Sequence, residues 1–229
     1  YTIRLADLLV RWLPDGVVGS ISSVPIGFKG TVGATDLLPV VRRQLMLVLA
    51  HLQALRETHG KEIVLALEPE PGCVLETTEE ACRLFEAMAL PAELKDLIGI
   101  CYDCCHQAVE FEEPHDSLAR LENAGIRIAK VQVSSALSLV SPSVERLARF
   151  DEPCYLHQVS VRHPDGTLHR FRDLPEAIAE HGRMLDAEWR CHFHVPIFSP
   201  GTADFGTTRS FLERMLPLLP SEPLLEVET

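Results

Sequence analysis

The most informative run of the sequence is Ile128-Ala129-Lys130-Val131-Gln132-Val133-Ser134, which reads as a β-strand. Side chains alternate across a strand, so Lys130, Gln132 and Ser134 share one face and the apolar residues share the other. A strand that is covered by helices on both faces normally reads as continuously apolar. The polar face of this strand, which we expect to be central, therefore requires a functional explanation.

Acid or imidazole side chains also stand toward the C-terminal ends of other strand-like runs. They are Glu68 after Ala66, Asp103 with Cys101, His192 with His194, and Glu226 with Glu228. A (β/α)8 barrel places its active site at these strand ends. Buried carboxylates without partners cost several kcal/mol each, and a shared cation would remove that cost. Several carboxylates with imidazoles and an amide oxygen suit Mg²⁺, Mn²⁺ or Zn²⁺.

Short β-rich runs alternate with helical stretches along the chain. The expected strands are 17–24, 63–68, 98–103, 128–133, 154–161, 191–195 and 224–228, and the expected helices are 2–13, 37–59, 77–90, 117–124, 143–150, 174–185 and 208–219. Such alternation predicts parallel βαβ units. We find no glycine-rich dinucleotide fingerprint and no internal repeat, so we expect residues 1–229 to form one α/β domain. The acids and imidazoles at the strand ends favour a (β/α)8 TIM barrel for this domain.

Two features modify this expectation. His163-Pro164-Asp165-Gly166 separates two β-like runs in the manner of a hairpin turn, which predicts a hairpin insertion over residues 155–172. The chain also begins at Tyr1 inside a helical pattern and ends on a strand pattern. We therefore expect an incomplete barrel that lacks one or more N-terminal strands.

Composition excludes several classes of protein. With 46% apolar and 24% charged residues the chain is globular. Its formal charge of −12 disfavours nucleic acid as a partner. No uncharged apolar run reaches the roughly 18 residues of a membrane span. The seven cysteines include Cys101, Cys104 and Cys105 in one short segment, which is typical of reduced thiols and predicts a cytoplasmic protein.

Each local pattern also has a simpler interpretation. Asp103 and His106 could be a helix cap and a surface histidine. The two late glutamates could be solvated side chains of an edge strand, and the His-x-His pair could be ordinary hydrogen-bonding residues. The CxxC at Cys101–Cys104 could be a thiolate zinc or redox site, although a second CxxC is absent from the sequence. We favour the metal-site interpretation because the patterns coincide on several strands.

Together the motifs resemble the xylose isomerase-like TIM barrels, the superfamily of sugar isomerases, epimerases and endonuclease IV. The matching series is Glu68 in Leu67-Glu68-Pro69, Asp103 and His106, Gln132, His192 and His194, and Glu228. The resemblance implies that these residues bind a divalent metal. Gln132 stands where histidine is commoner in the superfamily, and either Glu226 or Glu228 could be the last ligand.

More narrowly, four segments are similar to the EboE metabolite traffic proteins of bacterial Ebo operons. They are Leu65-Ala66-Leu67-Glu68-Pro69-Glu70-Pro71-Gly72, Cys101-Tyr102-Asp103-Cys104-Cys105-His106, His192-Phe193-His194-Val195-Pro196 and Leu225-Glu226-Val227-Glu228-Thr229. That family is longer, and the resemblance implies that its first barrel strands precede the point corresponding to Tyr1.

The resulting expectation is a metal-dependent isomerase or epimerase that acts on a small sugar-like or polyhydroxylated metabolite. The resemblance implies that Glu68 and Glu228 combine metal binding with proton transfer from opposite faces of the substrate. His157 and Glu226 are further substrate-binding candidates, and Lys29 and Lys130 could hold an anionic group. Two alternatives stay open: a metal-dependent hydrolase that uses the same residues, and a non-catalytic metabolite-binding component. The oligomeric state does not follow from the sequence.

Overall fold

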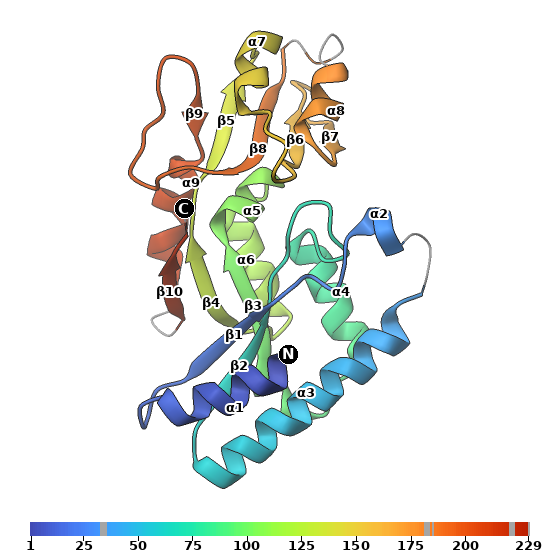
Figure 1. The fold of residues 1–229 in the computed structure, drawn as a ribbon, viewed down its shortest axis with the longest axis vertical. Coiled ribbons are helices and arrows are strands. Elements are labelled where there is room, and N and C mark those ends of the chain that lie inside the picture. The colour runs from blue at the N-terminus through green and yellow to red at the C-terminus, as the bar shows by residue number, and fades with distance from the viewer. Residues whose placement is uncertain (33–35, 181–183, 185, 220–222, 229) are drawn as a thin grey trace.

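The protein folds into two β-sheets that lie one above the other in the view of Figure 1, which is drawn from a computed structural model. The structure describes residues 1–229 except 33–35, 181–183, 185, 220–222 and 229. A parallel sheet with the long helices occupies the lower part of the view, and an antiparallel sheet occupies the upper part.

The parallel sheet has five strands in the order β1-β2-β3-β4-β10. They are β1 (Gly19–Ser23), β2 (Ile63–Leu67), β3 (Ile98–Asp103), β4 (Ile128–Val133) and β10 (Leu224–Val227). All five were expected from the sequence, within a few residues at each end. The sheet begins at β1 and ends at β10, so both of these strands are edges within the described part of the chain.

Helices cover one face of the parallel sheet and form the larger core with it. The helices of this half are α1 (Thr2–Trp12), α2 (Lys29–Val32), α3 (Leu38–His59), α4 (Thr78–Met88), η1 (Ala92–Leu97), α5 (Cys104–Val109), α6 (Pro114–Asn123), α9 (Arg209–Met215) and η4 (Leu216–Leu218). Helix α4 starts as predicted, because Thr77 and Glu80 form a reciprocal capping box. No helix within the described ranges is long and apolar enough to cross a membrane.

The second sheet is antiparallel, with the strand order β7-β6-β8-β5-β9. Its strands are β5 (Ala136–Val140), β6 (Val159–Arg162), β7 (Leu168–Phe171), β8 (Glu188–His194) and β9 (Gly206–Thr207), and its helices are α7 (Val144–Leu147), η2 (Ala148–Phe150) and α8 (Leu174–Ala179). The predicted hairpin is present as β6 and β7. It is a part of this sheet, because β6 also pairs with β8.

The expected TIM barrel, incomplete at its N-terminus, is wrong, since only five of the expected strands lie in the parallel sheet and the other two belong to a separate antiparallel sheet. Strands β6 and β8 had been assigned to the barrel, but β8 runs antiparallel to β5. The physical reason is that side chains alternate with the same period in parallel and antiparallel strands, so alternation carries no information on strand direction.

The chain passes from one sheet to the other at Ser134 and Ser135. Strand β4 ends at Val133, and β5 starts three residues later in the antiparallel sheet. The last residues of β8 dock at this junction, where the Val195 amide donates to the Ser135 carbonyl over 2.9 Å. The carboxyl ends of the parallel strands therefore face one end of β8.

Candidate metal centre

Asp103 is the last residue of β3 and the N-cap of α5. Its Oδ1 accepts hydrogen bonds from the His106 amide over 2.9 Å and from the Ser134 hydroxyl over 2.8 Å. The other carboxylate oxygen, Oδ2, is buried and has no partner among the described residues. Burial raises the pKa of Asp103, because an ionised carboxylate loses its hydration there.

His106 lies one turn into α5, where the Asp103 cap directs it across the end of the sheet. Its Nδ1 lies 2.9 Å from the carbonyl oxygen of Pro69. A carbonyl can only accept, so Nδ1 carries the ring proton and Nε2 carries the lone pair. Burial lowers the pKa of His106 to about 3, which keeps the ring neutral near pH 7.

His192 and His194 lie on β8, in the other sheet. The Nδ1 of His192 lies 2.8 Å from Gln158 Oε1, so that this ring also presents a bare Nε2. His192 Nε2 is 3.0 Å from His106 Nε2 and 3.3 Å from His194 Nε2. Burial and the neighbouring imidazoles lower the pKa of His192 well below its usual value. Three imidazole nitrogens therefore converge, and the two at 3.0 Å are both lone-pair acceptors.

Two glutamates complete the cluster from the carboxyl ends of β2 and β10. Glu68 Oε1 lies 3.8 Å from His106 Nδ1. Burial, followed by the negative charges of Asp103 and Glu228, raises the pKa of Glu68 to about 8. Burial likewise raises the pKa of Glu228, and its Oε2 is buried without a partner.

The donor atoms fall into three overlapping groups, in each of which all atoms lie within 4.8 Å of one another. The groups are Glu68, Asp103 and Glu228; Asp103, His106 and His194; and Cys105, His192 and His194. Asp103 and His194 each belong to two groups. The Nδ1 of His194 is also buried without a partner. The cluster thus has the ligand types and the unsatisfied atoms that a divalent cation requires.

A pocket of about 960 Å³ opens beside the imidazoles. It is lined by Phe28, Glu70, Cys154, Tyr155, Leu156, His157, Gln158, His192, Phe193, His194 and Glu228. The predicted residue His157 stacks on Phe193 with ring centroids 5.2 Å apart, so it belongs to the pocket wall and not to the donor cluster. The pocket is large enough for a small metabolite next to the donor atoms.

The remaining predicted residues are near the cluster but have other partners. Gln132 Oε1 accepts from the Cys101 thiol over 3.2 Å, and the Gln132 side chain hydrogen-bonds Glu228, so it orients the glutamate. Lys130 Nζ donates to Glu226 Oε2 over 2.9 Å. Of the two late glutamates, Glu228 therefore lies with the donor atoms, and Glu226 neutralises a lysine.

Lys29 is the predicted site residue that the structure places elsewhere. Its Nζ donates to Glu76 over 2.6 Å and to Glu80 over 3.0 Å. It borders a smaller pocket of about 260 Å³, together with Arg170 and Glu110. An ammonium that is held by two carboxylates has little charge to offer to a substrate at the donor cluster.

Four residues of the site were not predicted as functional. Ser134 and Gln158 orient ligands, Glu70 lines the pocket, and Cys105 belongs to a donor group. Ser134 lies on the polar face of its predicted strand together with Gln132, and this pattern could have identified it as a site residue. Burial, with the nearby charge of Asp103, raises the pKa of Glu70, which follows the predicted Glu68 by two residues.

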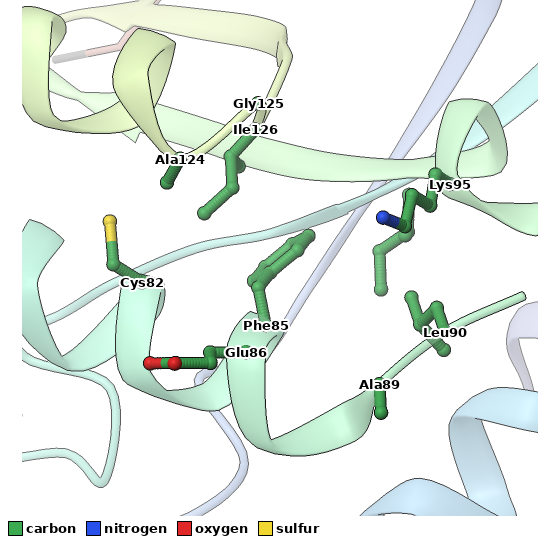
Figure 2. A pocket seen from close by; sticks show the side chains of 10 residues that line it. Cys82, Phe85, Glu86, Ala89, Leu90, Lys95, Ala124, Gly125 and Ile126 are labelled. Atoms are coloured by element: carbon green, nitrogen blue, oxygen red, sulfur yellow. The ribbon is translucent and has the colours of Figure 1, made fainter. Parts of the chain in front are cut away.

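Another pocket, of about 600 Å³, lies at the opposite end of β3, and its walls combine apolar side chains with Glu86 and Lys95 (Figure 2). It is lined by Cys82, Phe85, Glu86, Ala89, Leu90, Lys95, Ile98, Ala124, Gly125 and Ile126. Ile98 is the first residue of β3, whereas Asp103 is the last. None of the described residues that line this pocket is a histidine, so they do not offer the imidazole ligands of the donor cluster.

Comparison with protein-family models and with curated proteins gave no match for this chain.

Proposed function

We propose that the cluster is a divalent metal centre and that the protein is a metal-dependent isomerase or epimerase. Its ligands would be Glu68, Asp103, His106, His192, His194 and Glu228, with Zn²⁺, Mn²⁺ or Mg²⁺ as the ion. The observation that carries the metal proposal is the 3.0 Å approach of His106 Nε2 to His192 Nε2. Two neutral rings that both hold their protons on Nδ1 repel each other across such a contact, and a shared cation turns the repulsion into coordination.

The distances support this interpretation. Zinc binds imidazole nitrogen at about 2.0–2.1 Å, which puts two nitrogens of a tetrahedral site about 3.3 Å apart. His192 Nε2 and His194 Nε2 are separated by 3.3 Å. The Nδ1 contacts with Pro69 and Gln158 are the outer-shell bonds that metal-binding histidines normally make.

The carboxylates support proton transfer. A bound divalent ion polarises a carbonyl or hydroxyl oxygen and stabilises negative charge that develops on it. Glu68 and Glu228 come from strands on either side of Asp103, and burial raises the pKa of both, which favours a carboxyl group that can take up and release a proton near neutral pH. One carboxylate would take a proton from a substrate carbon and the other would return a proton to the opposite face, so the net proton count is unchanged.

We further propose a small polyhydroxylated substrate, in line with the resemblance to the xylose isomerase-like proteins. The pocket of about 960 Å³ borders Glu228 and two of the imidazoles. The formal charge of −12 argues against nucleic acid. All seven cysteines, each in the described ranges, are unpaired, which supports a reducing compartment such as the cytoplasm.

The test combines metal analysis of freshly purified protein with a metabolite screen for deuterium incorporation from D2O. We expect about one or more equivalents of a divalent metal per chain, and deuterium at a carbon next to a carbonyl or hydroxyl in one class of sugar. Glu68→Gln and Glu228→Gln should lose the exchange. Bound metal without exchange into any sugar would favour the non-catalytic binding protein, and protein that takes up no divalent metal would refute the proposal.

A further inference from the structure

One of the three donor groups contains a thiol, that of Cys105. Cys105 is the second residue of α5, and its side chain is fully buried. Its amide donates to the Ser134 hydroxyl over 2.8 Å, so the residue is held by the same serine that holds Asp103. The Cys105 sulfur, one nitrogen of His192 and one of His194 all lie within 4.8 Å of one another.

The neighbouring cysteines have different surroundings. Cys104, also fully buried, points to the helical side, where its sulfur lies 4.0 Å from the Met215 sulfur. The Cys101 thiol donates to Gln132 over 3.2 Å. Neither belongs to a donor group of the described residues. Of these three cysteines, Cys105 therefore has its sulfur next to the histidines of β8.

We propose that Cys105 joins His192 and His194 as a thiolate ligand of the cation, and that this softer set of ligands selects Zn²⁺ over Mn²⁺ or Mg²⁺. Thiolate and imidazole are preferred ligands of zinc, whereas carboxylate oxygens suit manganese and magnesium. His194 belongs to both this group and the group with Asp103 and His106. The sequence predicted these cysteines only as reduced thiols, and the juxtaposition with β8 points to a ligand role for Cys105.

Loading the site requires deprotonation. The thiol of Cys105 is buried, and the metal displaces its proton, which leaves to solvent as the Zn–S bond forms. The sulfur is neither oxidised nor reduced. This inference deepens the proposed function by adding a ligand type, and it shares with it the histidines of β8.

The experiment is X-ray absorption on the zinc-loaded full chain, with Co²⁺ absorption spectra as a second measurement. We expect a sulfur neighbour at about 2.3 Å from zinc and a near-ultraviolet thiolate-to-cobalt band. Cys105→Ser should remove both signals and weaken zinc binding by roughly 10- to 100-fold or more, with Mn²⁺ affinity unchanged. Cys104→Ser, the equally buried neighbour, is the matched control and should keep both signals.

The outcomes separate this inference from the proposed function. Zinc with only nitrogen and oxygen neighbours in the wild-type protein overturns the thiolate site, and the wild-type measurement does not depend on whether a variant folds. A cobalt band that persists in Cys105→Ser overturns it as well. If Mn²⁺ binds and deuterium exchange occurs while no sulfur signal is found, the thiolate site fails and the proposed function stands.

Discussion

The Ser134 hydroxyl donates a hydrogen bond to Asp103 Oδ1 over 2.8 Å. The same hydroxyl accepts a hydrogen bond from the Cys105 amide, also over 2.8 Å. One hydroxyl thus bridges the end of β3 and the first turn of α5 from the first residue after β4. It leaves only Asp103 Oδ2 free, which is the oxygen without a partner. Ser134 therefore decides which carboxylate oxygen is available to a cation.

Replacing Ser134 with alanine should lower both stability and metal affinity. Asp103 Oδ1 and the Cys105 amide would each lose a buried partner, which costs about 1–3 kcal/mol in the free energy of unfolding. Ser135→Ala is the control, because the Ser135 hydroxyl makes a longer 3.4 Å contact with Thr208. Urea denaturation measures both variants, and an equal loss in the two would contradict the special role of Ser134.

Titration with Mn²⁺ or Zn²⁺ should show which of Glu226 and Glu228 binds the metal. Glu228→Gln should weaken metal binding by about 1–3 kcal/mol, because a charged ligand becomes neutral at nearly constant volume. Glu226→Gln should leave metal affinity unchanged and affect stability, since it leaves Lys130 without its carboxylate partner. Isothermal titration calorimetry measures the affinities. Wild-type affinity in Glu228→Gln beside a large loss in Glu226→Gln would show that the ligand is Glu226.

Metal should raise the thermal stability of the wild-type chain. A ligand at 100 times its Kd that binds only the folded state adds about 2.7 kcal/mol, which corresponds to a Tm increase of roughly 5 to 10 °C for a chain of this size. Differential scanning calorimetry with Zn²⁺ and with a chelator measures the shift. The double variant Asp103→Asn/His194→Gln should show none, and a shift of equal size in that variant would place the cation elsewhere.

Without metal, stability should fall as the pH rises from 6.5 to 8. The folded-state pKa of Glu68 is about 8 against 4.5 for the free side chain, so the folded protein holds a proton that the unfolded chain releases in this window. Glu110, raised to about 7 mainly by burial, acts in the same direction. His106, lowered from 6.5 to about 3, costs stability only below pH 6.5.

Urea denaturation in the presence of a chelator tests this prediction at pH 6.5 and pH 8. Glu68→Gln should show a smaller difference between the two pH values than the wild type, and the part due to Glu110 should remain. Metal affinity should rise over the same interval, because a cation replaces the proton on Glu68. A wild-type protein that is equally stable at both pH values would rule out the buried, protonated Glu68.

Much of the parallel sheet could be predicted from the sequence, and the second sheet could not. Strands such as β2 and β3 are continuous apolar runs that end in an acid, which identifies both the element and the edge at which it stops. Strand β8 has an equally clear alternation, but nothing in the alternation says that it runs antiparallel to β5. The strand at 136–140 was not predicted, and it begins only three residues after the expected end of β4 at Val133.

The same physical limit applies to the site. Glu68 and Asp103 could be predicted to lie close together because parallel strands end at a common edge. Gln158 could not, since it is brought to His192 by the antiparallel pairing of β6 with β8. Cys105 could not be predicted for another reason. Helix α5 was not predicted, so the direction of the Cys105 side chain did not follow from the sequence.

The chain passes from the parallel sheet to the antiparallel sheet at Ser134 and Ser135, so the donor cluster forms only where the two sheets meet. Glu68 and Asp103 come from one sheet and His192 and His194 from the other, so secondary structure alone cannot create a high-affinity site. In the proposed metal centre, tight binding would require that the two sheets have docked, and the bound ion would then link one sheet to the other. Amide hydrogens in α5 and in β8 should consequently gain protection together when metal is added, although His106 and His192 lie 86 residues apart in the chain.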